Sequence, residues 1–173
     1  MKKFFCLVLC FLPISTQALS QIITGGVKYD INQARQELQT DLPDIKISKT
    51  EIYDINRIEN ITSLLKGITE LKDRTLAYFS DGSYGIIYKN KPLEVLYYTP
   101  DGILTHKELK NSQQYPYKAY KFDIRGNLVN MNLRTSENET FIFNTKGKLI
   151  AHWIGKYCYD KDDNIIMTRE IKK

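Results

Sequence analysis

Polar and apolar residues alternate along the C-terminal half of the chain with a period of two, which is the period of a β-strand. In Tyr120-Lys121-Phe122, two aromatic residues point to one face of such a strand, and a turn-like stretch from Asp123 to Gly126 follows. An Asp that opens a turn accepts hydrogen bonds from nearby backbone N–H groups. A Gly at its end supplies the left-handed residue that begins the return strand. The unit therefore predicts a β-hairpin.

This hairpin unit recurs. Residues 141–149 repeat it closely, residues 157–165 repeat it with Asp163 in place of the glycine, and looser copies lie near residues 80–83 and 97–104. Asp tolerates the left-handed region at some cost. The residues that we assign to the turns are Asp101, Gly102, Asp123, Gly126, Asn144, Gly147, Asp160 and Asp163.

The pattern predicts a mainly β fold, an antiparallel β-meander of hairpin repeats with one or two N-terminal helices. The expected strands are 75–80, 84–89, 93–98, 103–108, 117–123, 127–134, 139–144, 148–154, 156–160 and 164–170. Residues 111–116 form the longest break, a candidate boundary between two sub-sheets. No low-complexity linker is present, which favours one continuous fold.

In two stretches of the N-terminal part, the apolar residues show helical spacing in place of strand alternation. Ile31, Ala34 and Leu38 recur at helical spacing and predict a helix over residues 31–40. A second amphipathic helix is predicted over 58–72, weakened by Gly67. Residues 21–29 are interpreted as a short strand or a loose leader, and Ile45 to Ile52 as a strand.

The three clearest copies carry the pattern aromatic-x-aromatic-(Asp/Asn)-x-x-(Gly/Asp)-x-aliphatic. In this the C-terminal part resembles the YD-repeat (RHS-type) family. The resemblance implies secreted or surface β-hairpin repeats, which in long members coil into shells around a cargo. The series is also similar, less closely, to the repeats of MORN-type antitoxin-like proteins. The spacing between copies changes from 21 to 16 residues, so a plain β-meander with recurring turns is the alternative.

Residues 1–20 have the features of a signal peptide. Lys2 and Lys3 precede an apolar run that is shorter than the roughly 20 residues of a membrane span. Cleavage after Ala18 or after Ser20 fits the small residues there; an uncleaved anchor is the alternative. We therefore expect an exported protein, periplasmic or extracellular, without a transmembrane anchor after cleavage. We divide it into a signal peptide (1–20), an N-terminal α/β segment (21–75) and a hairpin repeat region (76–173).

Charge argues against nucleic acid as a partner. The chain carries +5, and without Lys2 and Lys3 it has 23 basic against 20 acidic residues. The basic residues are scattered, whereas a nucleic-acid footprint is a basic cluster.

Catalytic and metal-binding signatures are not found in the sequence. His106 and His152 are far apart, and Cys158 is the one cysteine that a mature chain keeps, so we interpret it as a small buried residue. Residues 160–164 resemble the start of a calcium loop, but Ile165 and Ile171 stand where that loop needs Gly and Glu, so a hairpin turn is favoured. We expect no cofactor, no metal and no enzymatic activity.

The remaining signal is aromatic. Tyrosine offers an apolar ring and a polar tip, so an exposed stripe would bind glycan or protein, while a buried one would be core. The candidate binding residues are Tyr97, Tyr98, Tyr117, Tyr120, Tyr157 and Tyr159. The leading hypothesis is a non-enzymatic binding or scaffolding module for an envelope protein or a polysaccharide. The alternatives are a glycan hydrolase that uses paired turn carboxylates, and an immunity or antitoxin-like partner of a secreted toxin.

Overall fold

The computed structural model describes residues 21–24, 27–57 and 67–169. Eleven strands form one antiparallel sheet in which each strand pairs with its neighbour in the chain, from β3 to β13. A separate hairpin of β1 (Gln21–Thr24) and β2 (Val27–Asp30) precedes the helix α1 (Ile31–Thr40). The strands of the large sheet are β3 (Ile68–Glu70), β4 (Arg74–Tyr78), β5 (Tyr84–Tyr88), β6 (Glu94–Tyr98), β7 (Leu104–Lys110), β8 (Tyr117–Asp123), β9 (Leu128–Ser136), β10 (Glu139–Asn144), β11 (Leu149–Ile154), β12 (Tyr157–Tyr159) and β13 (Ile165–Thr168). The mainly β meander with an N-terminal helix is thus confirmed.

One turn geometry builds the hairpins. In the turn of residues 123–127, the Gly126 N–H donates to the Asp123 carbonyl, and the Asp123 N–H donates to the Asn127 carbonyl. The same pair of backbone bonds recurs in residues 79–83, 99–103, 144–148 and 160–164. The fourth residue of each turn has a positive φ, and in the last turn Asp163 takes this conformation with φ 62°. The predicted turn chemistry is confirmed, including the Asp that replaces Gly.

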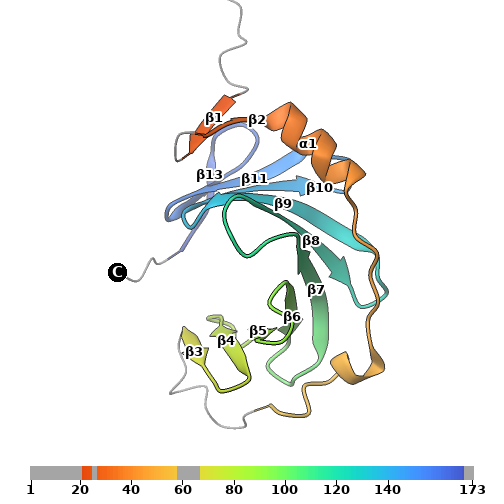
Figure 1. Cartoon of the computed structure of the whole chain (residues 1–173). Helices are drawn as coiled ribbons and strands as arrows, with labels where there is room; N and C mark the ends of the chain where they lie inside the picture. Colours follow the sequence, from red (N-terminus) through yellow and green to blue (C-terminus); the bar gives the residue numbers. More distant parts are fainter. Residues whose placement is uncertain (1–20, 25–26, 58–66, 170–173) are drawn as a thin grey trace, which may run out of the picture.

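The sheet curves into an open C (Figure 1). Register shifts interrupt the pairing beside several hairpins, for example between Tyr97 and Tyr98 and between Lys121 and Phe122. Such bulges increase the local twist of a strand pair. Strands β7 and β8 pair from His106/Asp123 to Lys110/Ala119, so the proposed sub-sheet boundary at residues 111–116 is wrong. The sheet is continuous across it.

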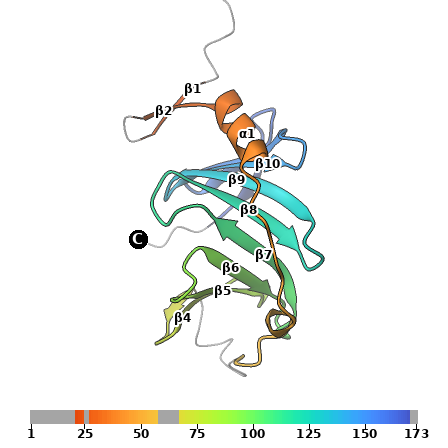
Figure 2. The same ribbon diagram turned by 45° about the vertical axis from the view of Figure 1, so that its right-hand side comes forward.

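The outer, convex face of the sheet holds the core. Helix α1 and the segment after it run along this face (Figures 1 and 2). Ala34 and Leu38 of α1 are buried against aromatic and aliphatic side chains of β8 to β10: Tyr120, Phe122, Met131, Leu133, Phe141 and Phe143. A second cluster joins β4 to β7 through Leu76, Tyr84, Ile86, Leu96, Tyr98 and Leu104.

Two expectations for the N-terminal part are wrong. Residues 45–52 do not form a strand: Ile45 and Ile47 pack on the two core clusters from irregular chain, and a short 3₁₀ helix, η1 (Lys49–Glu51), follows. The sequence predicts a helix over 58–72, but Ile68–Glu70 of that range form strand β3, because they pair with β4. Residues 58–66 of the range lie outside the described part. Since β3 and β4 belong to the sheet, the sheet begins before residue 76.

Candidate functional site

The inner, concave face of the sheet carries two open cavities at opposite ends of β6 to β8. One, of about 430 Å³, is lined by Thr75, Ile87, Lys89, Pro92, Lys110, Gln113, Tyr115, Tyr117 and Arg134. The other, of about 380 Å³, is lined by Phe79, Asp81, Ser83, Tyr84, Tyr97, Tyr98, Thr99, Pro100, Thr105, His106 and Lys121. We call the two cavities and the strand surface between them the inner groove.

Alternation along the strands places polar side chains on this surface. On β7 the inner positions are His106, Glu108 and Lys110, while Lys107 and Leu109 face the core side. On β8 and β9 the register puts Lys121 opposite Asn130. The inner side chains His106, Glu108, Lys110, Lys121 and Asn130 are all half-buried, so the groove is lined by polar groups that are partly desolvated.

Aromatic rings stand in the groove as two pairs. Phe79 and Tyr97 stack with centroids 6.3 Å apart in one cavity. Tyr115 and Tyr117 stack at 5.4 Å in the other. Phe79 and Tyr115 are 49% and 45% exposed, so one ring of each pair is open to solvent.

Glu108 lies between the two cavities on β7, next to the Tyr97 ring of one of them. The Tyr97 hydroxyl lies 3.5 Å from Glu108 Oε2, the limit of a hydrogen bond. Burial raises the pKa of Glu108, against the effect of Lys110, Lys121 and Arg134 nearby. Burial, and then the charge of Glu108, raise the pKa of Tyr97, so its phenol stays protonated.

Two amide oxygens in the groove have no partner within the described part of the chain. The Oδ1 atoms of Asn130 and Asn132 are buried and accept no hydrogen bond. A buried acceptor without a donor is costly, at about 1–3 kcal/mol.

On the outer face, an ion cluster fixes the segment after α1 to the sheet. Lys107 Nζ lies 3.0 Å from Glu51 Oε1 and 2.9 Å from Glu94 Oε2, and its side chain is 5% exposed. Burial lowers the pKa of Lys107, but hydrogen bonds to Glu94 and Glu51 outweigh it, so the pKa is raised. The Tyr98 hydroxyl donates to the Glu51 carbonyl at 2.9 Å. We interpret these groups as structural.

The six predicted binding tyrosines are divided between the two faces. Tyr97 and Tyr117 line the inner groove. Tyr98 and Tyr120 are each 2% exposed and belong to the outer core clusters; Tyr98 also borders one cavity of the inner groove, whereas Tyr120 lines neither cavity. Tyr157 and Tyr159 are half-buried on β12, away from both cavities. The spacing that puts Tyr120 and Phe122 on one face of β8 therefore indicated core residues and not a binding surface.

The turn carboxylates are engaged by their own loops. Asp123 Oδ1 accepts from the N–H groups of Arg125 and Asn127, and these bonds lower its pKa. Asp160 Oδ1 accepts from Asp162 and Asn164 in the same way. Within the described residues, no three His, Cys, Asp or Glu side chains gather as metal ligands. Cys158 is 3% exposed, which confirms the interpretation of a small buried side chain.

Sequence reasoning missed Lys110, Lys121, Arg134 and Glu108. The signal was present on β7, where the polar residues His106, Glu108 and Lys110 occupy consecutive inner positions while Leu109 on the outer side packs on the core. Charges at inner positions of a half-buried strand indicate a wet face.

No protein family, curated protein or solved structure shows significant similarity to this chain. Across the ranges 21–24, 27–57 and 67–169, no helix is long and apolar enough to cross a bilayer.

Proposed function

We propose that the protein is an exported, non-enzymatic binding module of the bacterial envelope that holds a polysaccharide along its inner groove. The signal-peptide pattern of residues 1–20 supports export. Helix α1 and residues 41–51 cover the outer face, so the inner face is the surface left for a ligand (Figure 2).

The observation that carries the proposal is the pairing of aromatic rings at both ends of the groove. Tyr117 and Lys121 mark the two ends along β8, which are about 13 Å apart at the usual rise per strand residue. An extended chain of sugars would meet one ring pair at each end. Aromatic faces offer apolar contact to a sugar ring, and tyrosine adds a polar tip.

The unpartnered acceptors between the cavities support the same ligand class. Asn130 and Asn132 occupy inner-face positions of β9, and their Oδ1 atoms, like Arg134 Nε, are buried without a hydrogen-bond partner in the described part of the chain, so a ligand would reach them only where the covering side chains move aside. Sugar hydroxyl groups both donate and accept hydrogen bonds, as these atoms require. An apolar ligand would leave them unsatisfied.

The hydrolase alternative gains no support from the groove. Glycoside hydrolysis needs two carboxyl groups about 5–9 Å apart on either side of the bond that breaks. Glu108 lies in the middle of the groove, while Asp123 accepts hydrogen bonds from its own turn.

Binding to a panel of neutral and acidic polysaccharides tests the proposal. Phe79→Ala and Tyr115→Ala each remove an exposed groove ring, and each is expected to lower the affinity about fivefold, a loss of about 1 kcal/mol. Tyr53→Ala is the matched control, because Tyr53 is 60% exposed on the segment after α1. Equal affinity of all three variants, or no binding by the wild type, contradicts the proposal. A single protein partner that co-purifies in place of glycan favours the antitoxin-like alternative.

A further inference from the structure

The lysines of β7 and β8 differ sharply between the two faces of the sheet. On the outer face, Lys107 binds Glu51 and Glu94, and Lys118 Nζ lies 3.0 Å from Glu37 Oε2 and 2.8 Å from Asp41 Oδ2. On the inner face, Lys110 and Lys121 form no ion pair with any carboxylate in the described ranges, and neither does Arg134 of β9. The lysine charges on the outer face are thus neutralised by carboxylates in direct contact, and those on the inner face are not.

Aromatic rings hold the inner cations in place. Lys121 Nζ lies 4.5 Å from the centre of the Tyr97 ring, and Lys110 Nζ lies 5.6 Å from that of Tyr117. The Arg134 guanidinium donates to the Tyr117 hydroxyl at 3.2 Å. These contacts orient the cations but leave them without a carboxylate in direct contact.

Burial makes a negative partner favourable at these positions. It lowers the pKa of Lys110 and of Lys121, against the attraction of Glu108. A partly desolvated ammonium group gains more from an opposite charge than one in open water, because the local dielectric is lower. Lys110, Lys121 and Arg134 lie close enough to Glu108 to lower its pKa, so three basic groups stand near this one carboxylate in the middle of the groove.

We propose that the polysaccharide is acidic, and that its anionic groups bind Lys110, Lys121 and Arg134 while its sugar rings pack on the aromatic pairs. This inference rests on the proposed polysaccharide-binding function. Carboxylate, sulfate and phosphate groups share the chemistry that the site requires, an oxygen-borne negative charge. Glu108 repels such a ligand and limits its affinity.

Dextran, carboxymethyl-dextran and dextran sulfate give a direct test, since they share one backbone and differ in charge. Calorimetric titration of the full chain is expected to show at least about tenfold tighter binding of the two acidic polymers than of dextran, with an affinity that falls as salt rises. The preferred anion identifies the ligand group.

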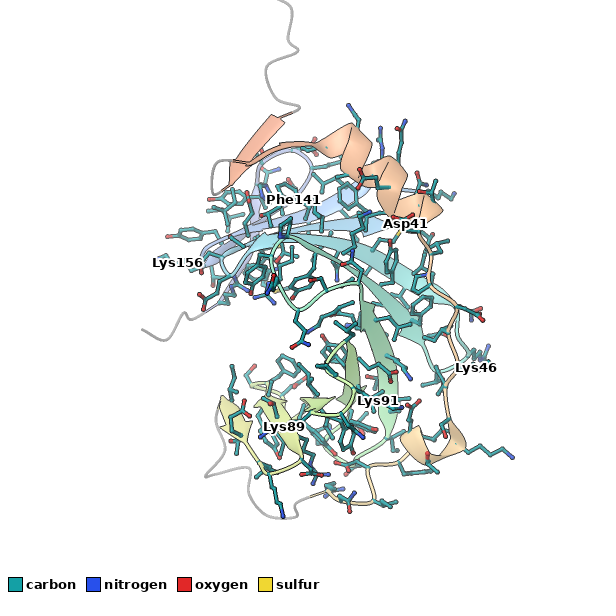
Figure 3. The ribbon with its side chains drawn as sticks, in the orientation of Figure 1. Asp41, Lys46, Lys89, Lys91, Phe141 and Lys156 are labelled. Carbon is teal, nitrogen blue, oxygen red and sulfur yellow. The ribbon has the colours of Figure 1, made fainter. Side chains whose placement is uncertain are left out.

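Single substitutions separate the groove from general attraction to polyanions. Lys110→Gln and Lys121→Gln are each expected to weaken binding of the acidic polymers about tenfold, and Lys121→Arg to preserve it. Glu108→Gln is expected to tighten it about fivefold, since it removes a like charge. Lys46→Gln, on the outer segment that Figure 3 shows away from the groove, makes the same charge change and is expected to have no effect.

The outcomes distinguish the two proposals. Equal binding of all three polymers overturns the acidic ligand and leaves the polysaccharide function standing. Equal loss in the Lys46 and Lys121 variants, or unchanged affinity in the Glu108 variant, also overturns it, because attraction would then be general. Binding of none of the polymers, together with none of the wider panel, overturns both. Circular dichroism of each variant verifies that the sheet is intact.

Discussion

Gly147 lies where the turn of residues 144–148, between β10 and β11, meets helix α1, and its replacement by alanine tests that contact. The residue has φ +74°, and a β-carbon there would lie 2.8 Å from Gln39 Cδ and 2.9 Å from Arg35 Cγ. Gly126 is the matched control. It has φ +80° in the same turn geometry, but its nearest neighbour would be Ile45 Cγ2 at an ordinary 3.6 Å.

The two substitutions share one cost and differ in another. A left-handed alanine costs about 1–2 kcal/mol, which both variants suffer. Crowding against the Gln39 and Arg35 side chains adds about 1–3 kcal/mol for Gly147→Ala alone. We therefore expect the free energy of unfolding to fall by about 1–2 kcal/mol in Gly126→Ala and by about 2–5 kcal/mol in Gly147→Ala.

Urea unfolding measures this difference. Trp153 is the one tryptophan of the chain, so its fluorescence reports on the sheet and far-UV circular dichroism provides a second probe. The m-value should not change. Adding Gln39→Ala to Gly147→Ala should recover part of the loss, because the exposed Gln39 side chain is one of the two crowded neighbours. Equal losses in the two glycine variants would refute the packing of α1 over this turn.

Three further predictions concern the core, the ion cluster of Lys107, and the half-buried His106 and His152. Leu38→Ala should lower the free energy of unfolding by about 2–5 kcal/mol, and Leu42→Ala, 51% exposed, should be close to neutral in the same urea assay. Lys107→Met should lower it by about 1–3 kcal/mol, because the partly buried Glu51 and Glu94 lose their nearest cation and retain Lys91 at 3.8 and 3.6 Å; a neutral result would show that the cluster does not hold the segment after α1. Burial lowers the pKa of His106 and of His152, so the unfolded chain binds more protons as the pH falls below about 6.5. Stability should therefore decrease as the pH falls from about 6.5 toward the lower folded pKa values, and less steeply in the His106→Gln/His152→Gln double variant; parallel pH profiles would contradict this.

Local chemistry made the hairpins predictable. The Asp or Asn that opens a turn and the Gly that closes it act within five residues, so the sequence alone indicates them. The amphipathic spacing of Ile31, Ala34 and Leu38 likewise predicts α1 with the observed bounds. These features need no knowledge of distant partners.

Features that depend on distant contacts were not predictable. Ile68–Glu70 fits a helical pattern, but it forms a strand because the edge of β4 is available for pairing. Ile45 and Ile47 alternate as in a strand, yet they fill gaps on the outer core from irregular chain. Propensity is a weak prior where tertiary contacts decide.

The candidate site was predicted in part. Tyr97 and Tyr117 lie in the groove, whereas Tyr98 and Tyr120 are core, since a period of two assigns residues to two faces but does not say which face is covered. The packing of α1 and residues 41–51 on the outer face decides that question, and the curvature of the sheet produces the cavities.

The side chains of β7 and β8 offer the most direct test of the inner groove as the ligand surface. In protein labelled with ¹³C at the lysine ε-carbon, carboxymethyl-dextran is titrated and the lysine signals are followed by NMR. The account predicts that the signals of Lys110 and Lys121 shift, while those of Lys107 and Lys118, on the opposite face of the same strands, do not. Shifts of the outer lysines with unchanged signals from Lys110 and Lys121 would contradict it.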